Sequence, residues 1–121
     1  MNNASTIARH YLAAWNEPDG AARRQHVQQL FTANARYVDP MMQGSGHDGI
    51  EALIAGARQH FPGHRFELSG VPDGHNDVIR FSWTLRAPDG DNVAHGTDIA
   101  VVAGDGRLAS VTGFLDKPQA A

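Results

Sequence analysis

The spacing of apolar residues changes once along this chain, and that change constrains the fold more than any single motif. In the first half, apolar residues recur at intervals of three and four, as on one face of a helix. From Arg65 onward, alternating apolar and polar residues form runs separated by Gly-containing turn signals. Helices followed by a run of strands predict an α+β domain, with the helices packed on one face of a curved sheet.

Three helices are expected in the first half. The first begins at Ser5, a residue that caps helices well, and ends at about Asn16. The second ends at about Phe31. The third opens at a capping box, in which Glu51 follows Asp48 by three residues, and ends near residues 62–63.

One short strand precedes the third helix, and four strands follow it as an antiparallel meander. Pro40 stops the short strand because proline cannot donate to a ladder. The Met- and Gly-containing loop after it, residues 41–46, is expected to form a lid or pocket rim. Turns are expected at 72–74, 88–90 and 104–106, each a Pro/Gly/Asp cluster. The strand candidates span residues 35–39, 65–69, 78–85, 92–102 and 108–115.

Length and composition indicate one domain, residues 1–121, and exclude several classes of function. The absence of cysteine excludes thiolate catalysis and Cys-based metal sites. A net charge of −3 argues against a nucleic-acid partner. The chain shows no signal-peptide pattern and no apolar run of membrane-spanning length, so we expect a cytoplasmic protein with no membrane partner. Of the seven histidines, five are scattered among loops, a helix end and a strand, so we expect neither a metal nor another cofactor. These five are His47, His60, His64, His75 and His95.

Two aspartates stand out. Asp39 shares a strand face with Tyr37, and its carboxylate suits a general base that accepts and then releases a proton. The simpler interpretation is that Asp39 and Pro40 open a turn. Asp98 interrupts an apolar strand, where an ionised carboxylate would be costly to bury. Kept neutral in a dry pocket, Asp98 could donate to an enolate oxygen. Alternatively, it faces solvent or pairs with an arginine such as Arg36 or Arg80.

Three segments resemble the family that includes nuclear transport factor 2, the polyketide-cyclase-like SnoaL proteins and ketosteroid isomerase. They are residues 9–16 of the first helix, Tyr37-Val38-Asp39-Pro40, and Gly96-Thr97-Asp98 shortly before 104–106. The similarity in element order covers nearly the whole chain. It implies a cone-shaped, curved antiparallel sheet wrapped by three N-terminal helices, and a homodimer formed through the outer face of the sheet. The apolar residues expected on that outer face are Phe66, Leu68, Val78, Ile79 and Val101.

The resemblance to ketosteroid isomerase implies that Tyr11, Asp39 and Asp98 converge on one carbonyl substrate, with Asp39 as base and the other two as oxyanion donors. The ligand would be a small apolar or carbonyl-containing molecule. Arg36, Arg58, His60 and Arg80 are a departure from that pattern, since some of them could reach the cavity. The residues expected to bind the ligand are Trp15, Phe61, Phe81, Trp83, Val111 and Leu115.

Other functions are compatible with the same residues, because one fold hosts many functions. The chain could be a non-catalytic ligand carrier or dimerisation module. A hydrolase or dehydratase that uses Asp39 or Asp98 to activate water is a further alternative. The apolar strand residues could equally be ordinary core, and Trp83 could lie at a dimer face.

Overall fold

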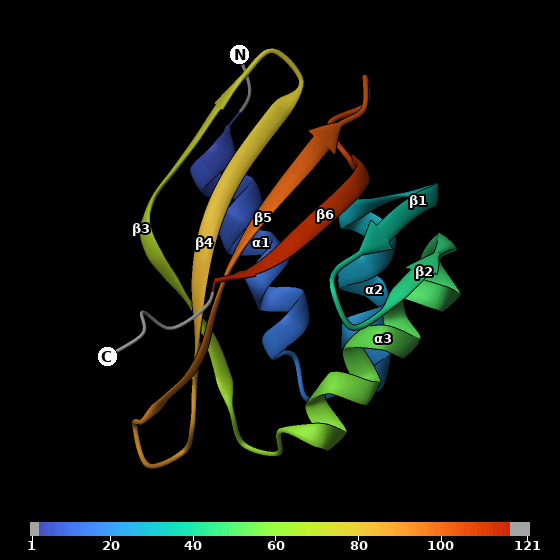
Figure 1. The fold of residues 1–121 in the computed structure, drawn as a ribbon. Coiled ribbons are helices and arrows are strands. Elements are labelled where there is room, and N and C mark those ends of the chain that lie inside the picture. The colour runs from blue at the N-terminus through green and yellow to red at the C-terminus, as the bar shows by residue number, and fades with distance from the viewer. Residues whose placement is uncertain (1–2, 117–121) are drawn as a thin grey trace.

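The computed structural model describes residues 3–116 and shows three helices against one face of a curved sheet (Figure 1). The α+β prediction is therefore confirmed. No helix within residues 3–116 is long and apolar enough to cross a membrane. The elements, in chain order, are α1 (Ala4–Asn16), α2 (Gly20–Leu30), β1 (Phe31–Val38), β2 (Gln43–Ser45), α3 (Gly46–His60), β3 (Arg65–His75), β4 (Val78–Arg86), β5 (Asn92–Val102) and β6 (Leu108–Asp116).

The six strands form one open sheet in the order β2-β1-β6-β5-β4-β3. Strands β3 to β6 are the predicted antiparallel meander. The expectation of a wholly antiparallel sheet was wrong, because β1 pairs in parallel with β6. Strand β2, expected as part of a loop, adds to the free edge of β1 in the antiparallel sense. The long connection that a parallel pair requires runs here through β2, α3 and the strands β3 to β5.

The first and third helices begin differently from the sequence prediction. Ser5 is not the cap: α1 begins at Ala4 after Asn3, which makes no side-chain capping bond. The expected capping box is also absent, because α3 begins at Gly46 and the side chain of Glu51 turns toward Arg23. Only α2 has a side-chain cap, Asp19, which accepts from the backbone nitrogen of Ala22 at 2.9 Å.

Two strands are longer than their sequence patterns suggested. Strand β1 begins at Phe31, directly after α2, and so takes in a residue assigned to the helix. Strand β3 runs through residues 72–74, which were expected to form a turn, because a register shift between Ser69 and Asp73 absorbs the irregularity. The chain instead reverses just after His75, where Asn76 adopts a positive φ of 52°.

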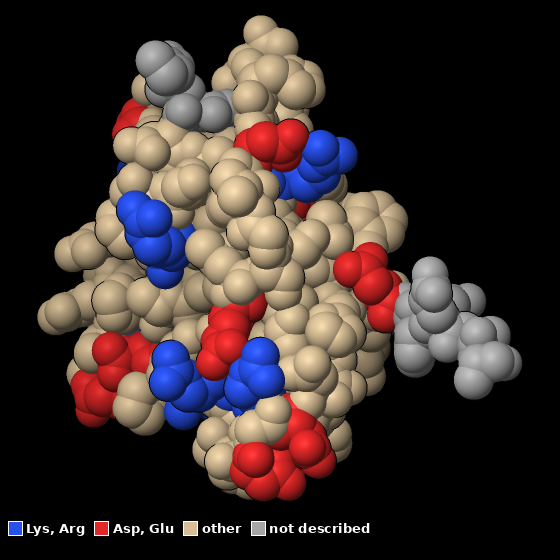
Figure 2. Space-filling view, turned by 90° about the vertical axis from the view of Figure 1, so that its left-hand side faces the viewer, with Lys and Arg blue, Asp and Glu red and all other residues tan. Residues whose placement is uncertain are grey.

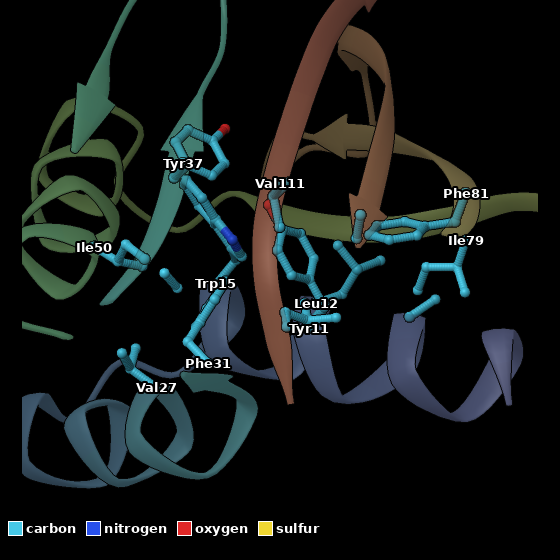
Figure 3. Packing of buried hydrophobic residues seen from close by; sticks show 14 of the residues in the cluster. Tyr11, Leu12, Trp15, Val27, Phe31, Tyr37, Ile50, Ile79, Phe81 and Val111 are labelled. Carbon is cyan, nitrogen blue, oxygen red and sulfur yellow. The ribbon is translucent and has the colours of Figure 1, made fainter. Parts of the chain in front are cut away.

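The core fills the space between the helices and the inner face of the sheet (Figure 3). Ile79 is fully buried there, and Phe66 and Leu68 pack against it. These three residues therefore do not lie on the outer face, where a dimer surface was expected. Hydroxyl groups occupy part of that face instead, including a Ser82–Thr97 hydrogen bond of 2.8 Å. The largest fully buried side chains are Tyr11, Val27, Phe31, Ile50, Ile54, Ile79, Phe81, Leu108 and Val111.

Several charged side chains pair on the surface, and one pair lies between helices. Figure 2 shows acidic and basic side chains next to each other on one face of the molecule. Arg23, only 8% exposed, joins α2 to α3 through a 3.0 Å contact with Glu51 and also donates to the backbone oxygen of Glu17. The contact between Arg80 and Asp73 has a similar length, 2.9 Å, but both side chains are exposed.

We predict that Arg23→Ala lowers the free energy of unfolding by about 3 kcal/mol, because it leaves the partly buried Glu51 carboxylate without its nearer partner. Arg80→Ala is the matched control and should cost much less stability than Arg23→Ala, since solvent screens its exposed pair. Urea denaturation of both variants measures the difference. Equal losses would contradict the structural role assigned to Arg23.

Candidate active site

A cavity of about 420 Å³ opens between the inner face of the sheet and the helices α1 and α3. Its wall is mainly aromatic and aliphatic. The charged residues on it are Asp39 and Asp98, together with the titratable His60, and no lysine or arginine of the described chain lines it. A ligand inside would therefore meet an apolar surface, two carboxyl groups and few other polar atoms.

The structure brings most of the expected site residues together. Tyr11, Asp39 and Asp98 all line the cavity. Of the expected ligand-binding residues, the lining includes Trp15, Phe61, Trp83 and Leu115. Phe81 and Val111 do not line it; they lie in the core below, where Phe81 packs edge-on against Tyr11 with ring centroids 5.1 Å apart.

Asp98 is the buried acid of the site. It is 3% exposed, on β5, and its carboxyl group interacts with the side chains of Trp83 and Tyr11. Burial raises the pKa of Asp98 to about 7, and the nearby charge of Asp39 adds to the rise. Hydrogen bonds from Trp83 and Tyr11 act in the opposite direction but do not cancel it. At neutral pH Asp98 therefore holds its proton for a large part of the time.

No arginine neutralises Asp98, although the sequence left that alternative open. Arg80 pairs with Asp73 on the outer surface, and Arg36 is exposed on β1. Arg58 donates to the backbone oxygen of Trp15 at 3.2 Å. These three arginines therefore do not offset the effect of burial, which is the largest cause of the raised pKa of Asp98.

Asp39 sits at the end of β1 and accepts hydrogen bonds at both oxygens. The Tyr37 hydroxyl donates to Oδ2 at 2.6 Å, while the backbone nitrogens of Met41 and Met42 donate to Oδ1 at 2.8 and 2.9 Å. Asp39 therefore organises the turn after β1, as the simpler interpretation held, and also presents its carboxylate to the cavity. A carboxylate fixed in this way is a positioned acceptor.

Tyr37 is a site residue that the sequence analysis did not select. Burial raises the pKa of both Tyr11 and Tyr37 well above the usual value, and the neighbouring aspartates add to the effect. Both hydroxyls therefore keep their protons and act as donors. The sequence did contain a signal for Tyr37. Residues two apart on a strand share a face, so Tyr37 lies on the same side as Asp39.

Two glycines make room for the polar groups. In the strand register Gly113 lies opposite Asp98, and Gly96 lies opposite Trp83. A β-carbon at Gly113 would lie 2.8 Å from Asp98 Oδ1 and 3.2 Å from Asp39 Cβ, so the two acids flank one glycine. The Trp83 ring lies over Gly96, where any side chain would collide with it.

Two features surround the site. His95 lies three residues before Asp98 on β5 and faces the other side of the sheet, where its Nδ1 lies 2.9 Å from Thr84 Oγ1. Met41 and Met42 line the cavity, whereas residues 44–46 belong to β2 and the start of α3 and do not. The pocket rim is therefore the methionine pair.

A buried acid with a raised pKa, a positioned carboxylate and two tyrosine hydroxyls thus meet in one apolar cavity of an α+β cone. The sequence model of the SnoaL-like domain matches residues 8–111. The chain belongs to the SnoaL-like family, which confirms the resemblance noted from the sequence. No curated protein sequence is significantly similar to it.

Several solved structures are similar to the chain. A protein of Agrobacterium tumefaciens strain C58, described as a candidate isomerase of the SnoaL-like family, has 57% identity and a TM-score of 0.91 over 93% of this chain and 96% of its own. A candidate SnoaL-like polyketide cyclase of Jannaschia sp. CCS1 has 17% identity and a TM-score of 0.72 over 93% and 87% of the two chains. A Catenulispora acidiphila protein with a ketosteroid isomerase-like fold, in complex with trimethylamine, has 14% identity and a TM-score of 0.74 over 92% and 85%. The last two share the fold.

The raised pKa of Asp98 predicts that wild-type stability falls as pH rises. From its ordinary value of 3.8 to about 7, the folded state holds a proton that the unfolded state has lost. Relative to Asp98→Asn, wild type should therefore lose stability between pH 4 and 7, by on the order of 4 kcal/mol at most, and then level off. Urea denaturation of both proteins across this range measures it. A difference independent of pH would show that Asp98 titrates normally.

Proposed function

We propose that the protein is an isomerase or cyclase-like enzyme that moves a proton next to a carbonyl group of a small, uncharged molecule. The observation that supports this most strongly is the placement of Asp39 and Asp98 on either side of Gly113 in one apolar cavity. One of the two acids is positioned as an acceptor, and the other is kept largely protonated by burial. A positioned carboxylate and a buried acid that retains its proton divide the roles of base and donor.

In this mechanism Asp39 removes a proton from the carbon beside the carbonyl. The electron pair of the C–H bond forms the enolate, and the charge develops on the carbonyl oxygen. Tyr11 and the protonated Asp98 donate hydrogen bonds to that oxygen, and the dry cavity strengthens them. Asp39 then returns its proton to another carbon, so the reaction needs no net supply of protons. Tyr37 holds the Asp39 carboxylate in place.

The composition of the wall supports an uncharged substrate. Asp39 and Asp98 would repel carboxylates and phosphates, and no lysine or arginine of the described lining compensates for them. Aromatic rings of Trp15, Phe66 and Trp83 pack edge to face in the wall of the cavity, with centroids 5.2–5.5 Å apart. Such a wall favours a flat apolar body with one oxygen directed to Tyr11 and Asp98.

A homodimer formed through the outer face of the sheet is part of the proposal. No helix of residues 3–116 covers that face (Figure 1). Phe114 on β6 is 54% exposed and Val38 on β1 is 37% exposed, and alternation places both on the outer side. These residues, rather than Phe66 and Leu68, would form the apolar part of the contact.

A second candidate function is the non-catalytic binding of a small amine. Aromatic rings beside carboxylates attract an alkylammonium ion through cation–π and ionic contacts, and this cavity contains both. The Catenulispora protein, which shares the fold, was solved in complex with trimethylamine. The two candidates require opposite charge states of Asp98.

Titration with 4-methylphenol and with trimethylammonium at several pH values separates the candidates. The phenol mimics an enolate, so its affinity should fall as pH rises through about 7 and Asp98 loses its proton. Tyr11→Phe and Asp98→Asn should each weaken phenol binding about tenfold, or about 1.4 kcal/mol, whereas the exposed Asp73→Asn should not. An affinity for the amine that rises over the same range, without phenol binding, would favour the second candidate.

Catalysis is measured as the exchange of α-protons of small ketones for deuterium, followed by NMR. Asp39→Asn should abolish exchange while phenol binding persists, because only the base is lost. Exchange that is unchanged in Asp39→Asn would overturn the role of Asp39.

A further inference from the structure

The indole N–H of Trp15 is an unused hydrogen-bond donor in the cavity wall. Among residues 3–116, Trp15 Nε1 is the one fully buried side-chain nitrogen or oxygen without a hydrogen-bond partner. Trp15 is 5% exposed and lines the cavity. Buried donors are almost always paired, so an orphan in a pocket wall indicates a partner that arrives from the pocket.

The indole nitrogen faces the place where the proposed oxyanion forms. Trp15 follows Tyr11 by four residues on α1, which puts both on one helix face. Figure 3 shows the indole nitrogen of Trp15 and the hydroxyl oxygen of Tyr11 turned toward the same space. The two rings lie 6.1 Å apart between centroids. The indole N–H approaches the Tyr11 hydroxyl oxygen closely enough to lower the pKa of that hydroxyl, but the pair does not reach hydrogen-bond geometry.

Trp15 is held too firmly to find another partner by rotating. Its ring packs against Tyr37 and Phe66, with centroids 5.6 and 5.5 Å away. The next residue, Asn16, ties the end of α1 to β3 by donating to the backbone oxygen of Phe66 and accepting from its nitrogen, at 2.9 and 2.8 Å. Arg58 holds the backbone oxygen of Trp15. The donor is therefore fixed in advance of binding.

We propose that Trp15 Nε1 is a third donor to the substrate oxygen that Tyr11 and Asp98 hold, an inference that rests on the proposed function. A ketone oxygen has two lone pairs, which Tyr11 and Asp98 satisfy. An enolate oxygen carries more negative charge and accepts a third bond. The Trp15 donor therefore strengthens binding of the enolate more than that of the ketone, which is the difference that accelerates a reaction.

The indole proton resonances test this directly. The chain has two tryptophans, so its indole region holds two resonances, and Trp15→Phe assigns them. Addition of 4-methylphenol to the wild-type protein should move the Trp15 Nε1–H resonance to higher frequency, as expected when the N–H becomes hydrogen-bonded. The isosteric hydrocarbon 1,4-dimethylbenzene fills the same space without an oxygen and should not. Equal responses to the two ligands would overturn the proposal.

Affinities give a second, independent measurement. Trp15→Phe should lower the preference for 4-methylphenol over 1,4-dimethylbenzene about tenfold. Phe66→Leu is the control, because it changes the same aromatic cluster without removing a donor and should affect both ligands equally. A preference that falls in Tyr11→Phe and Asp98→Asn but not in Trp15→Phe would overturn this inference alone. A preference indifferent to all three changes, or no binding of either ligand, would overturn the proposed function as well.

Discussion

The burial of one carboxyl group, that of Asp98, is the constraint on which the rest of the site depends. A strand places it against the apolar inner face of the sheet, where an ionised carboxylate is costly. Tyr11 and Trp83 offer hydrogen bonds, and the pKa still rises to about 7, since burial outweighs them. The same burial that weakens the fold at higher pH keeps a neutral donor available in the cavity. Stability and the proposed activity are thus linked at one residue.

The arrangement of helices and strands brings the other groups of the site close to Asp98. Helix α1 covers β3 and β4 and carries Tyr11 and Trp15 into the cavity (Figure 1). The parallel pairing of β1 with β6 brings Asp39 beside Gly113, next to Asp98, although 59 positions separate the two acids in the sequence numbering. Arg80 and Arg86 form ion pairs on the surface, and no cation of residues 3–116 lowers the pKa of Asp98.

The sequence predicted the α+β class and the meander, because periodicity and turn residues are local signals. It also selected Tyr11, Asp39 and Asp98, helped by family resemblance. It failed where the outcome depended on tertiary contacts. Glu51 pairs with Arg23 and does not cap α3. Residues 72–74 belong to β3 and form no turn, because the strand register shifts between Ser69 and Asp73. Two further features could not be predicted: the indole N–H of Trp15 has no partner, and the absence of a side chain at Gly113 leaves space for Asp98. Both depend on packing between strands and helices, which local sequence patterns do not encode.

The most direct test of the account is a titration of the Asp98 side chain by carbon NMR, with ¹³C-labelled aspartate and with Asp98→Asn to assign the resonance. The account predicts a midpoint near pH 7 for the Asp98 carboxyl carbon. A midpoint near the ordinary value of 3.8 would mean that Asp98 is ionised at neutral pH. It could not then act as a donor, and the proposed proton-transfer function would be contradicted.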